Sequence, residues 1–97
     1  MERVSYHRLA RRELNEVAQY YESESPGLGA AFLDEVQRCT QAIVKFPEAA
    51  PLITATIRRR LVLRFPYALL HSIKPDKVRV LAVMNLKRRP MYWVGRE

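Results

Sequence analysis

The amino-acid sequence predicts an α+β protein with the element order β-α-α-β-β-β. Apolar residues recur every three or four positions in the first half of the chain, the spacing of amphipathic helices. In the second half they alternate with polar residues, the spacing of strands, and a proline-containing turn divides the last alternating stretch. We therefore expect a two-helix hairpin packed on one face of a small antiparallel sheet, followed by a short C-terminal tail or helix.

The first half of the chain contains the predicted helices. A short alternating piece, residues 2–6, predicts a strand, and helical spacing follows over residues 7–24. Ser25-Pro26-Gly27 predicts a tight connection between helices. The second helix extends from Leu28 to the Phe46-Pro47 pair, because the residue before a proline is disfavoured in the α region. The apolar stripes are Ala10, Leu14, Val17, Ala18 and Tyr21, then Leu28, Phe32, Val36, Cys39, Ile43 and Phe46.

The second half of the chain predicts three strands. Residues 54–65 alternate, which puts Arg58, Arg60 and Arg64 on a single face. After Pro66, residues 67–73 and 78–85 form a hairpin around the turn at residues 74–77, which has proline at its favoured second position. Because 97 residues, 48% of them hydrophobic, suffice for one core and are too few for two, we expect residues 1–97 to form one domain.

Composition limits the class of protein. The single Cys39 excludes an internal disulfide framework and a cysteine-based metal site, and no apolar run reaches the length of a membrane span, so we expect a cytoplasmic protein without a metal or cofactor. Residues 1–53 hold six basic and eight acidic residues, and residues 54–97 hold eleven and two. This basic second half favours an anionic partner, either nucleic acid or an acidic protein.

Basic and aromatic side chains gather at the two ends of the predicted third and fourth strands. Guanidinium groups beside aromatic rings suit phosphate and bases, but a basic strand face is also commonly solvated or in contact with an acidic protein. Metal-free RNA cleavage would need a base, an acid and cations, and only His7 and His71 are histidines. We expect His7 to cap a helix and His71 to be structural. We expect the working surface to comprise Arg64, Tyr67, Lys87, Arg88, Arg89, Tyr92, Trp93 and Arg96, with Trp93 either a core residue or an exposed anchor.

The order of several short motifs resembles the RelE/ParE toxin superfamily. These motifs are Tyr6-His7 with Ala10, Glu13 and Leu14; Tyr20-Tyr21-Glu22; Ser25 to Gly29; Phe32 to Val36; Phe46-Pro47; Ile57-Arg58-Arg59; Phe65-Pro66-Tyr67; Asp76; Val80 to Val83; and Arg88 to Arg96. The resemblance covers nearly the whole chain. It implies a growth-inhibiting toxin of a type II toxin-antitoxin module, of the kind that stabilises plasmids. It also implies an acidic antitoxin that neutralises the toxin and supplies the contact with operator DNA.

Two branches of this superfamily differ in activity. Ribosome-dependent mRNA endonucleases commonly carry an arginine after the aromatic residue that opens the third strand, where this chain has Ala68, and many have a histidine where it has Asn85. The resemblance is therefore greater to the ParE-like branch, whose members bind DNA gyrase and have no assigned catalytic residues. If the chain is instead a nuclease, the resemblance implies a metal-independent site of Arg58, Arg60, Arg88 and Tyr92. A third alternative is a degenerate member that binds only its antitoxin.

Overall fold

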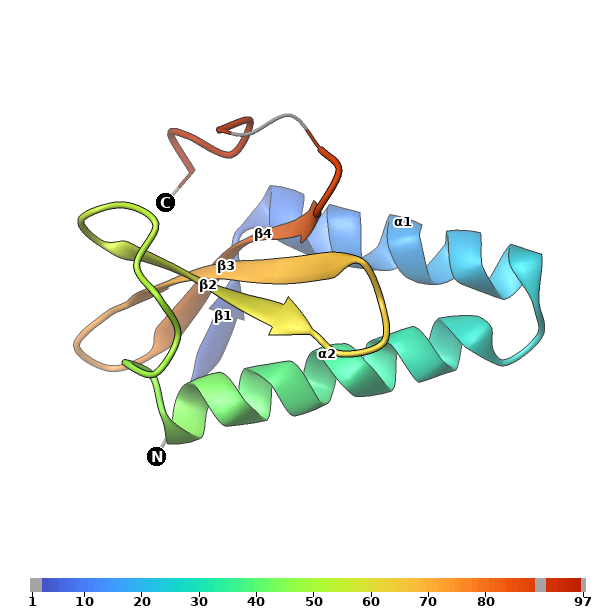
Figure 1. The fold of residues 1–97 in the computed structure, drawn as a ribbon, viewed down its shortest axis with the longest axis horizontal. Coiled ribbons are helices and arrows are strands. Elements are labelled where there is room, and N and C mark those ends of the chain that lie inside the picture. Colours follow the sequence, from blue (N-terminus) through green and yellow to red (C-terminus); the bar gives the residue numbers. More distant parts are fainter. Residues whose placement is uncertain (1–2, 89–90, 97) are drawn as a thin grey trace.

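The helices of the structure form an antiparallel hairpin. The structure is a computed structural model that describes residues 3–88 and 91–96. Helix α1 (Arg8–Glu24) and helix α2 (Leu28–Lys45) lie side by side (Figure 1). They approach so closely that a Cβ atom on Gly29 would lie 2.5 Å from the carbonyl oxygen of Ala18, so only glycine fits there.

The loops around the helices are fixed by local hydrogen bonds. At the start of α1, His7 Nδ1 accepts a hydrogen bond from the Leu9 amide at 3.1 Å, which confirms the capping role expected for this histidine. Between the helices, Glu22 accepts hydrogen bonds from the amides of Gly27 and Gly29, and Gly27 has a φ of 87°. The Ser-Pro-Gly connection is therefore the tight turn that the sequence predicts.

The four strands form one mixed sheet of order β1-β4-β3-β2. The strands are β1 (Val4–Tyr6), β2 (Ile57–Val62), β3 (Tyr67–Ile73) and β4 (Val78–Asn85). The last three are antiparallel neighbours, as predicted, but β1 runs parallel to β4, so the expected all-antiparallel sheet is wrong at this edge. Short turns force antiparallel pairing on β2, β3 and β4, whereas both helices separate β1 from β4 and remove that constraint. Glu2, expected in the first strand, lies outside the described residues.

Two other boundaries differ from the prediction. Strand β2 ends at Val62, so Arg64 and Phe65 belong to a turn rather than to the strand. Arg64 has a φ of 73°, which an extended strand does not contain. At its other end, β2 begins at Ile57 rather than at Thr54. An isolated bridge pairs Leu52, in the preceding loop, with Arg58 of the strand. Apolar and polar residues alternate through all of these positions, so the alternation does not show where the strand ends. The turn is required by Pro66, which has no amide to donate within a sheet.

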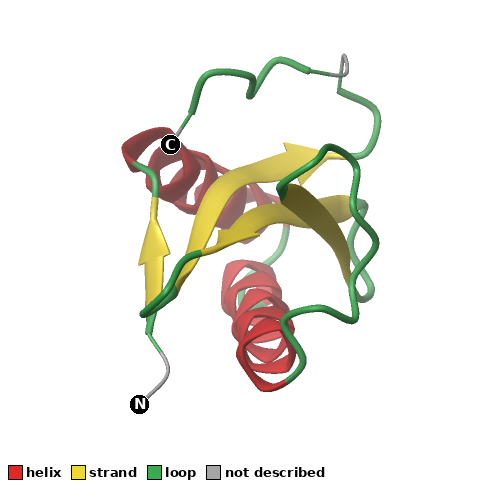
Figure 2. Ribbon diagram, turned by 90° about the vertical axis from the view of Figure 1, so that its left-hand side faces the viewer, coloured by secondary structure: helices red, strands yellow, loops and turns green. Residues whose placement is uncertain are grey.

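Both faces of the sheet are covered. The helices cover one face with a core that includes Phe32, Ile43, Leu69 and Val80. On the other face, Trp93 packs against Leu70 and Ala82. The loop after β4 arches over the sheet on the side away from α2 (Figure 2). In the described residues no helix has the length and apolarity to cross a membrane.

Candidate functional site

The end of β4 and the start of β3 lie together and carry the first part of the candidate site. Tyr67 is paired with Asn85 in the sheet, and Asn85 Nδ2 donates a hydrogen bond to the Tyr67 hydroxyl at 3.3 Å. The other side-chain atom of Asn85, Oδ1, accepts a hydrogen bond from the Lys87 amide at 2.8 Å. Asn85 therefore shapes the turn that presents Lys87 and Arg88, which are both exposed.

A cavity of about 350 Å³ lies beside this turn. Its lining combines both signs of charge with one phenol ring: Glu13, Glu16, Val17, Tyr67, Val83, Asn85, Lys87 and Arg88. The two glutamates come from α1, and the two basic residues follow β4. The cavity therefore presents separate acidic and basic sides, which suits a protein partner better than a purely anionic ligand.

Tyr92 lies between two arginines. The guanidinium carbon of Arg88 is 4.1 Å from the ring centroid, and that of Arg96 is 5.1 Å from it. Burial, together with the neighbouring Glu13 carboxylate, raises the pKa of Tyr92 to about 12. The phenol is therefore protonated near neutral pH and cannot act as a base there.

A buried ion pair holds the C-terminal segment in place. Arg96 donates to both carboxylate oxygens of Glu13, at 3.0 and 2.9 Å, and to the Leu81 carbonyl at 3.1 Å. Glu13 also accepts a hydrogen bond from the Val83 amide at 3.0 Å. The two side chains are only 11% and 16% exposed. Arg96, expected to contact a target, is therefore occupied within the molecule.

The sequence did not reveal that Glu13 binds Arg96 and the Val83 amide. It is 83 residues from Arg96, and nothing in the spacing pairs the two. One signal was available: Glu13 lies three positions after Ala10 and one before Leu14, so it is beside the buried stripe of α1 rather than opposite it. A carboxylate in such a position requires a partner.

Trp93 is a core residue, because its side chain is only 4% exposed. It packs against Leu70 and Ala82, with Tyr92, Ile57 and Met84 around it. Of the two roles expected for Trp93, the exposed anchor is therefore wrong, since an indole buried in this way cannot reach a partner without unfolding the segment. Arg89, which lies between the turn and this segment, is outside the described residues.

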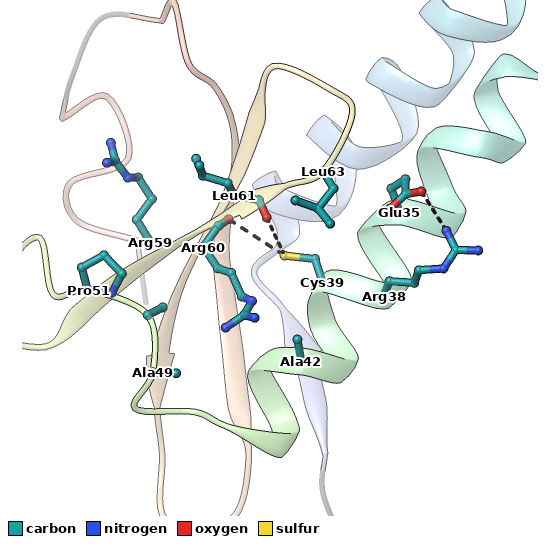
Figure 3. Close-up of a pocket in the computed structure, with 11 residues that line it drawn as sticks. Glu35, Arg38, Cys39, Ala42, Ala49, Pro51, Arg59, Arg60, Leu61 and Leu63 are labelled. Atoms are coloured by element: carbon teal, nitrogen blue, oxygen red, sulfur yellow. Dashed lines mark hydrogen bonds and ion pairs between the residues drawn. The ribbon is translucent and has the colours of Figure 1, made fainter.

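The predicted arginine face of the second strand is not an open cationic surface. Arg58 donates to the carbonyl oxygens of Glu48 and Ala50, at 3.0 and 2.7 Å, and so fixes the loop after α2. Arg60 points into a groove between α2 and β2 (Figure 3). Arg64, in the turn, is 3.4 Å from the Glu35 carboxylate. All three are on the side of the sheet that the helices cover. The alternation of residues shows that the three arginines share a face, but not which face the helices cover.

The structure does not bring the four nuclease candidates together. Arg58 is paired with His71, and Arg88 follows the strand end at which Asn85 pairs with Tyr67. The four steps of β3 between these positions span about 13 Å. Tyr92 also packs on the face of the sheet opposite to the helices, away from Arg60. The metal-independent nuclease site that the resemblance implied is therefore not assembled in this structure.

His71, in the middle of β3, is fully buried. Neither ring nitrogen has a hydrogen-bond partner within residues 3–88 and 91–96. Burial lowers the pKa of His71, although the nearby Leu69 and Pro47 backbone groups oppose this shift without forming a hydrogen bond of good geometry. The ring is therefore packed as a neutral group, in agreement with the structural role expected for it.

Comparison with known proteins decides the family. Residues 4–90 match the family model of the "ParE toxin of type II toxin-antitoxin system, parDE". The chain belongs to the ParE toxin family. The fold is similar to that of a chain in the solved structure of the chromosomal ParDE TA system from P. aeruginosa, with a TM-score of 0.75 at 13% identity, over 88% of this chain and 96% of that one. No curated protein matches the sequence.

The family assignment confirms the resemblance seen in the sequence and places this ParE-family chain in a type II toxin-antitoxin system. Such a system consists of two proteins, so an antitoxin protein is the implied partner. The likeness to the P. aeruginosa structure, at 13% identity, supports the fold.

Proposed function

We propose that this ParE-family chain inhibits DNA gyrase by binding it, and that a cognate acidic antitoxin neutralises this activity. The contact with gyrase is the basic-aromatic end, which we define as Lys87, Arg88 and Tyr92, with the buried ring of Tyr67 beneath them as support. Operator DNA is bound only through the antitoxin. The proposal requires no metal, cofactor or catalytic residue.

The observation that carries the proposal is the fixed geometry of the basic-aromatic end. Arg88 is stacked on Tyr92, and the segment that holds Tyr92 is tied down by the Glu13–Arg96 pair and by buried Trp93. A preorganised arginine-aromatic pair is typical of residues that dominate protein interfaces, because little side-chain entropy remains to be lost on binding. The dispersed positions of Arg58 and Arg60 favour binding over phosphoryl chemistry.

A supercoiling assay with purified gyrase and the folded, antitoxin-free protein tests the proposal. The protein should block supercoiling or accumulate gyrase–DNA cleavage complexes. Because an arginine at the centre of an interface commonly contributes about 2 kcal/mol, Arg88→Ala should weaken inhibition about tenfold or more. Arg12→Ala is the matched control, since Arg12 is an exposed arginine on α1 outside the cavity lining. An inactive wild-type protein, or equal loss in both variants, would contradict the proposal.

The mRNA endonuclease alternative has one observation in its favour, the presence of Tyr67, Lys87 and Arg88 around a single cavity. Such a group could hold a phosphate. Primer extension on cellular mRNA after induction separates the two activities. Discrete codon-linked cuts that vanish in Arg88→Ala would replace the gyrase proposal, whereas harmless overexpression without the antitoxin would indicate a degenerate member.

A further inference from the structure

A small cavity lies on the face of the sheet that the C-terminal segment covers (Figure 2). It encloses about 220 Å³ and is lined by Thr56, Ile57, Ser72, Ile73, Lys74, Leu81 and Arg96. Ser72 and Leu81 are buried and form its base, whereas Thr56, Ile73 and Lys74 are exposed at its mouth. The cavity shares no lining residue with the one beside the basic-aromatic end, so it is a separate feature of the molecule.

Ser72 places an unpaired polar group at the base of this cavity. The residue is only 6% exposed, and its Oγ has no hydrogen-bond partner in the described part of the chain. Two positions earlier in β3, Leu70 packs with Trp93, and the alternation of a strand directs Ser72 to that same face. A buried hydroxyl without a partner is unfavourable, so a ligand that accepts its hydrogen bond would be stabilised there.

Positive charge surrounds the Ser72 hydroxyl. Lys74 and Arg96 line the cavity. Arg79 pairs with Ser72 in the β3–β4 ladder, so the two side chains share a face of the sheet, with Cβ atoms about 5 Å apart. Arg79 donates to Ser5 Oγ at 3.0 Å and contributes to the site through its charge. A buried hydroxyl donor among three cations suits a negatively charged ligand.

Neighbouring acids offset only part of this charge. Glu13 is paired with Arg96, whose bonds to Glu13 and Leu81 use three of its five N–H groups. Asp76 is in the exposed turn after Lys74 and lines a different cavity. Among these groups, three cations are therefore balanced by one carboxylate that is already paired.

The size and the donors of the cavity indicate the class of ligand. A volume of about 220 Å³ is below the range of about 300 to 1,000 Å³ that is typical of sites for drug-sized molecules. The hydroxyls of Thr56 and Ser72, the Lys74 ammonium and the remaining N–H groups of Arg96 can all donate hydrogen bonds. A tetrahedral oxyanion offers acceptor oxygens in several directions at once, whereas a water molecule would leave the positive charge uncompensated.

We propose that this cavity binds a free tetrahedral oxyanion, phosphate or sulfate, through Ser72, Thr56, Lys74 and Arg96. The inference goes beyond the proposed inhibition of gyrase and does not rest on it. Because Arg96 also anchors the segment that carries Trp93, a bound ion should stabilise the folded chain and this segment with it.

NMR of the full isotope-labelled chain tests the site directly. Phosphate added at constant ionic strength should shift the amide signals of Ser72, Lys74 and Arg96 and saturate with a Kd of about 1 mM. Ser72→Ala should weaken binding about tenfold, because a hydrogen bond to a charged ligand is lost. Lys74→Gln should weaken it about threefold. Lys77→Gln is the matched control, since Lys77 is in the same turn and does not line the cavity.

Thermal unfolding separates a specific site from the general stabilisation that phosphate gives to proteins. Without phosphate, Ser72→Ala should be at least as stable as wild type, because a buried hydroxyl without a partner is removed. With phosphate at ten times its Kd, the Tm of wild type should rise by about 5 °C more than that of Ser72→Ala.

Adenosine monophosphate distinguishes the free ion from a phosphate carried on a larger molecule. It should bind no more tightly than phosphate, because the cavity has room only for the ion. The inference is wrong if phosphate gives no saturating shifts, if wild type and Ser72→Ala bind it equally well, or if adenosine monophosphate binds more tightly. The supercoiling result does not depend on any of these outcomes.

Discussion

The two surfaces of this molecule are built in opposite ways. The groove beside β2 is bordered by the exposed side chains of Leu61 and Leu63, and the Leu61 carbonyl accepts a hydrogen bond from Cys39 Sγ at 3.7 Å. The basic-aromatic end is complete in itself, with Tyr92 held between two arginines and Arg96 satisfied by Glu13 and Leu81. The groove side is thus an apolar surface without a fixed polar arrangement, whereas the rigid cation-aromatic pair favours a preformed partner surface.

The largest expected effect comes from removing the anchor of the C-terminal segment. Trp93→Ala should lower the free energy of unfolding by about 3 to 5 kcal/mol, because a fully packed indole is lost and a cavity remains. Val94→Ala, at a neighbouring side chain that is 61% exposed, should change it by about 0.5 kcal/mol or less. Urea unfolding followed by circular dichroism measures both. An equal, small effect would mean that the far face of the sheet is not a second core.

The Glu13–Arg96 pair should have the next largest effect. Glu13→Gln should cost about 2 kcal/mol, since a charged hydrogen-bond acceptor of a mostly buried guanidinium is replaced by a neutral one. Trp93 is the chain's one tryptophan, so its fluorescence reports directly on this segment. We expect a red shift of the emission with the helical signal retained.

Glu16→Gln is the matched control for this change, because Glu16 is an exposed glutamate of α1 that lines the same cavity as Glu13. It should leave the emission unchanged. A red shift in Glu16→Gln, or none in Glu13→Gln, would show that the ion pair does not position the C-terminal segment.

The smallest of these effects is a dependence of the free energy of unfolding on pH, which we expect from His71 in β3. Burial lowers the pKa of His71 in the folded state below its usual value near 6.5. The unfolded chain therefore takes up a proton first as the pH falls, and the stabilisation that is complete above about pH 6.5 is lost below it. The free energy of unfolding should therefore fall as the pH is lowered from 7.5 to 5.5.

His71→Leu should flatten this pH dependence, as measured by urea unfolding at several pH values. The pKa of His7 is also lowered, by burial first and then by neighbouring arginines, so it contributes in the same direction. His7→Ser retains a side-chain cap acceptor and removes this second contribution. A pH dependence that disappears in His7→Ser and persists in His71→Leu would contradict the role given to His71.

Most of the fold follows from local sequence patterns. The stripe from Ala10 to Tyr21 and the Ser-Pro-Gly connection set the helical hairpin, and the proline turn sets the β3–β4 hairpin. The direction of β1 could not be predicted, because a three-residue strand that no turn connects to its neighbour carries no local information on direction. The end of β2 was also missed, since Arg64 keeps the alternation while its backbone leaves the strand.

The candidate site was less predictable, because it depends on contacts between distant residues. Lys87 and Arg88 were placed correctly beside Tyr67, as the turn geometry requires. Arg58 was not, since its role depends on carbonyl groups of the loop after α2. Glu13 acquires its role only when α1 packs beside β4 and the C-terminal segment folds back.

The assignment of the target contact to the basic-aromatic end is tested most directly by measuring gyrase inhibition by two variants. Arg88→Ala should lose gyrase inhibition, and Leu63→Ser, which changes an exposed side chain beside the groove, should retain it. Equal loss of inhibition in both variants, with the free energy of unfolding unchanged, would contradict the assignment.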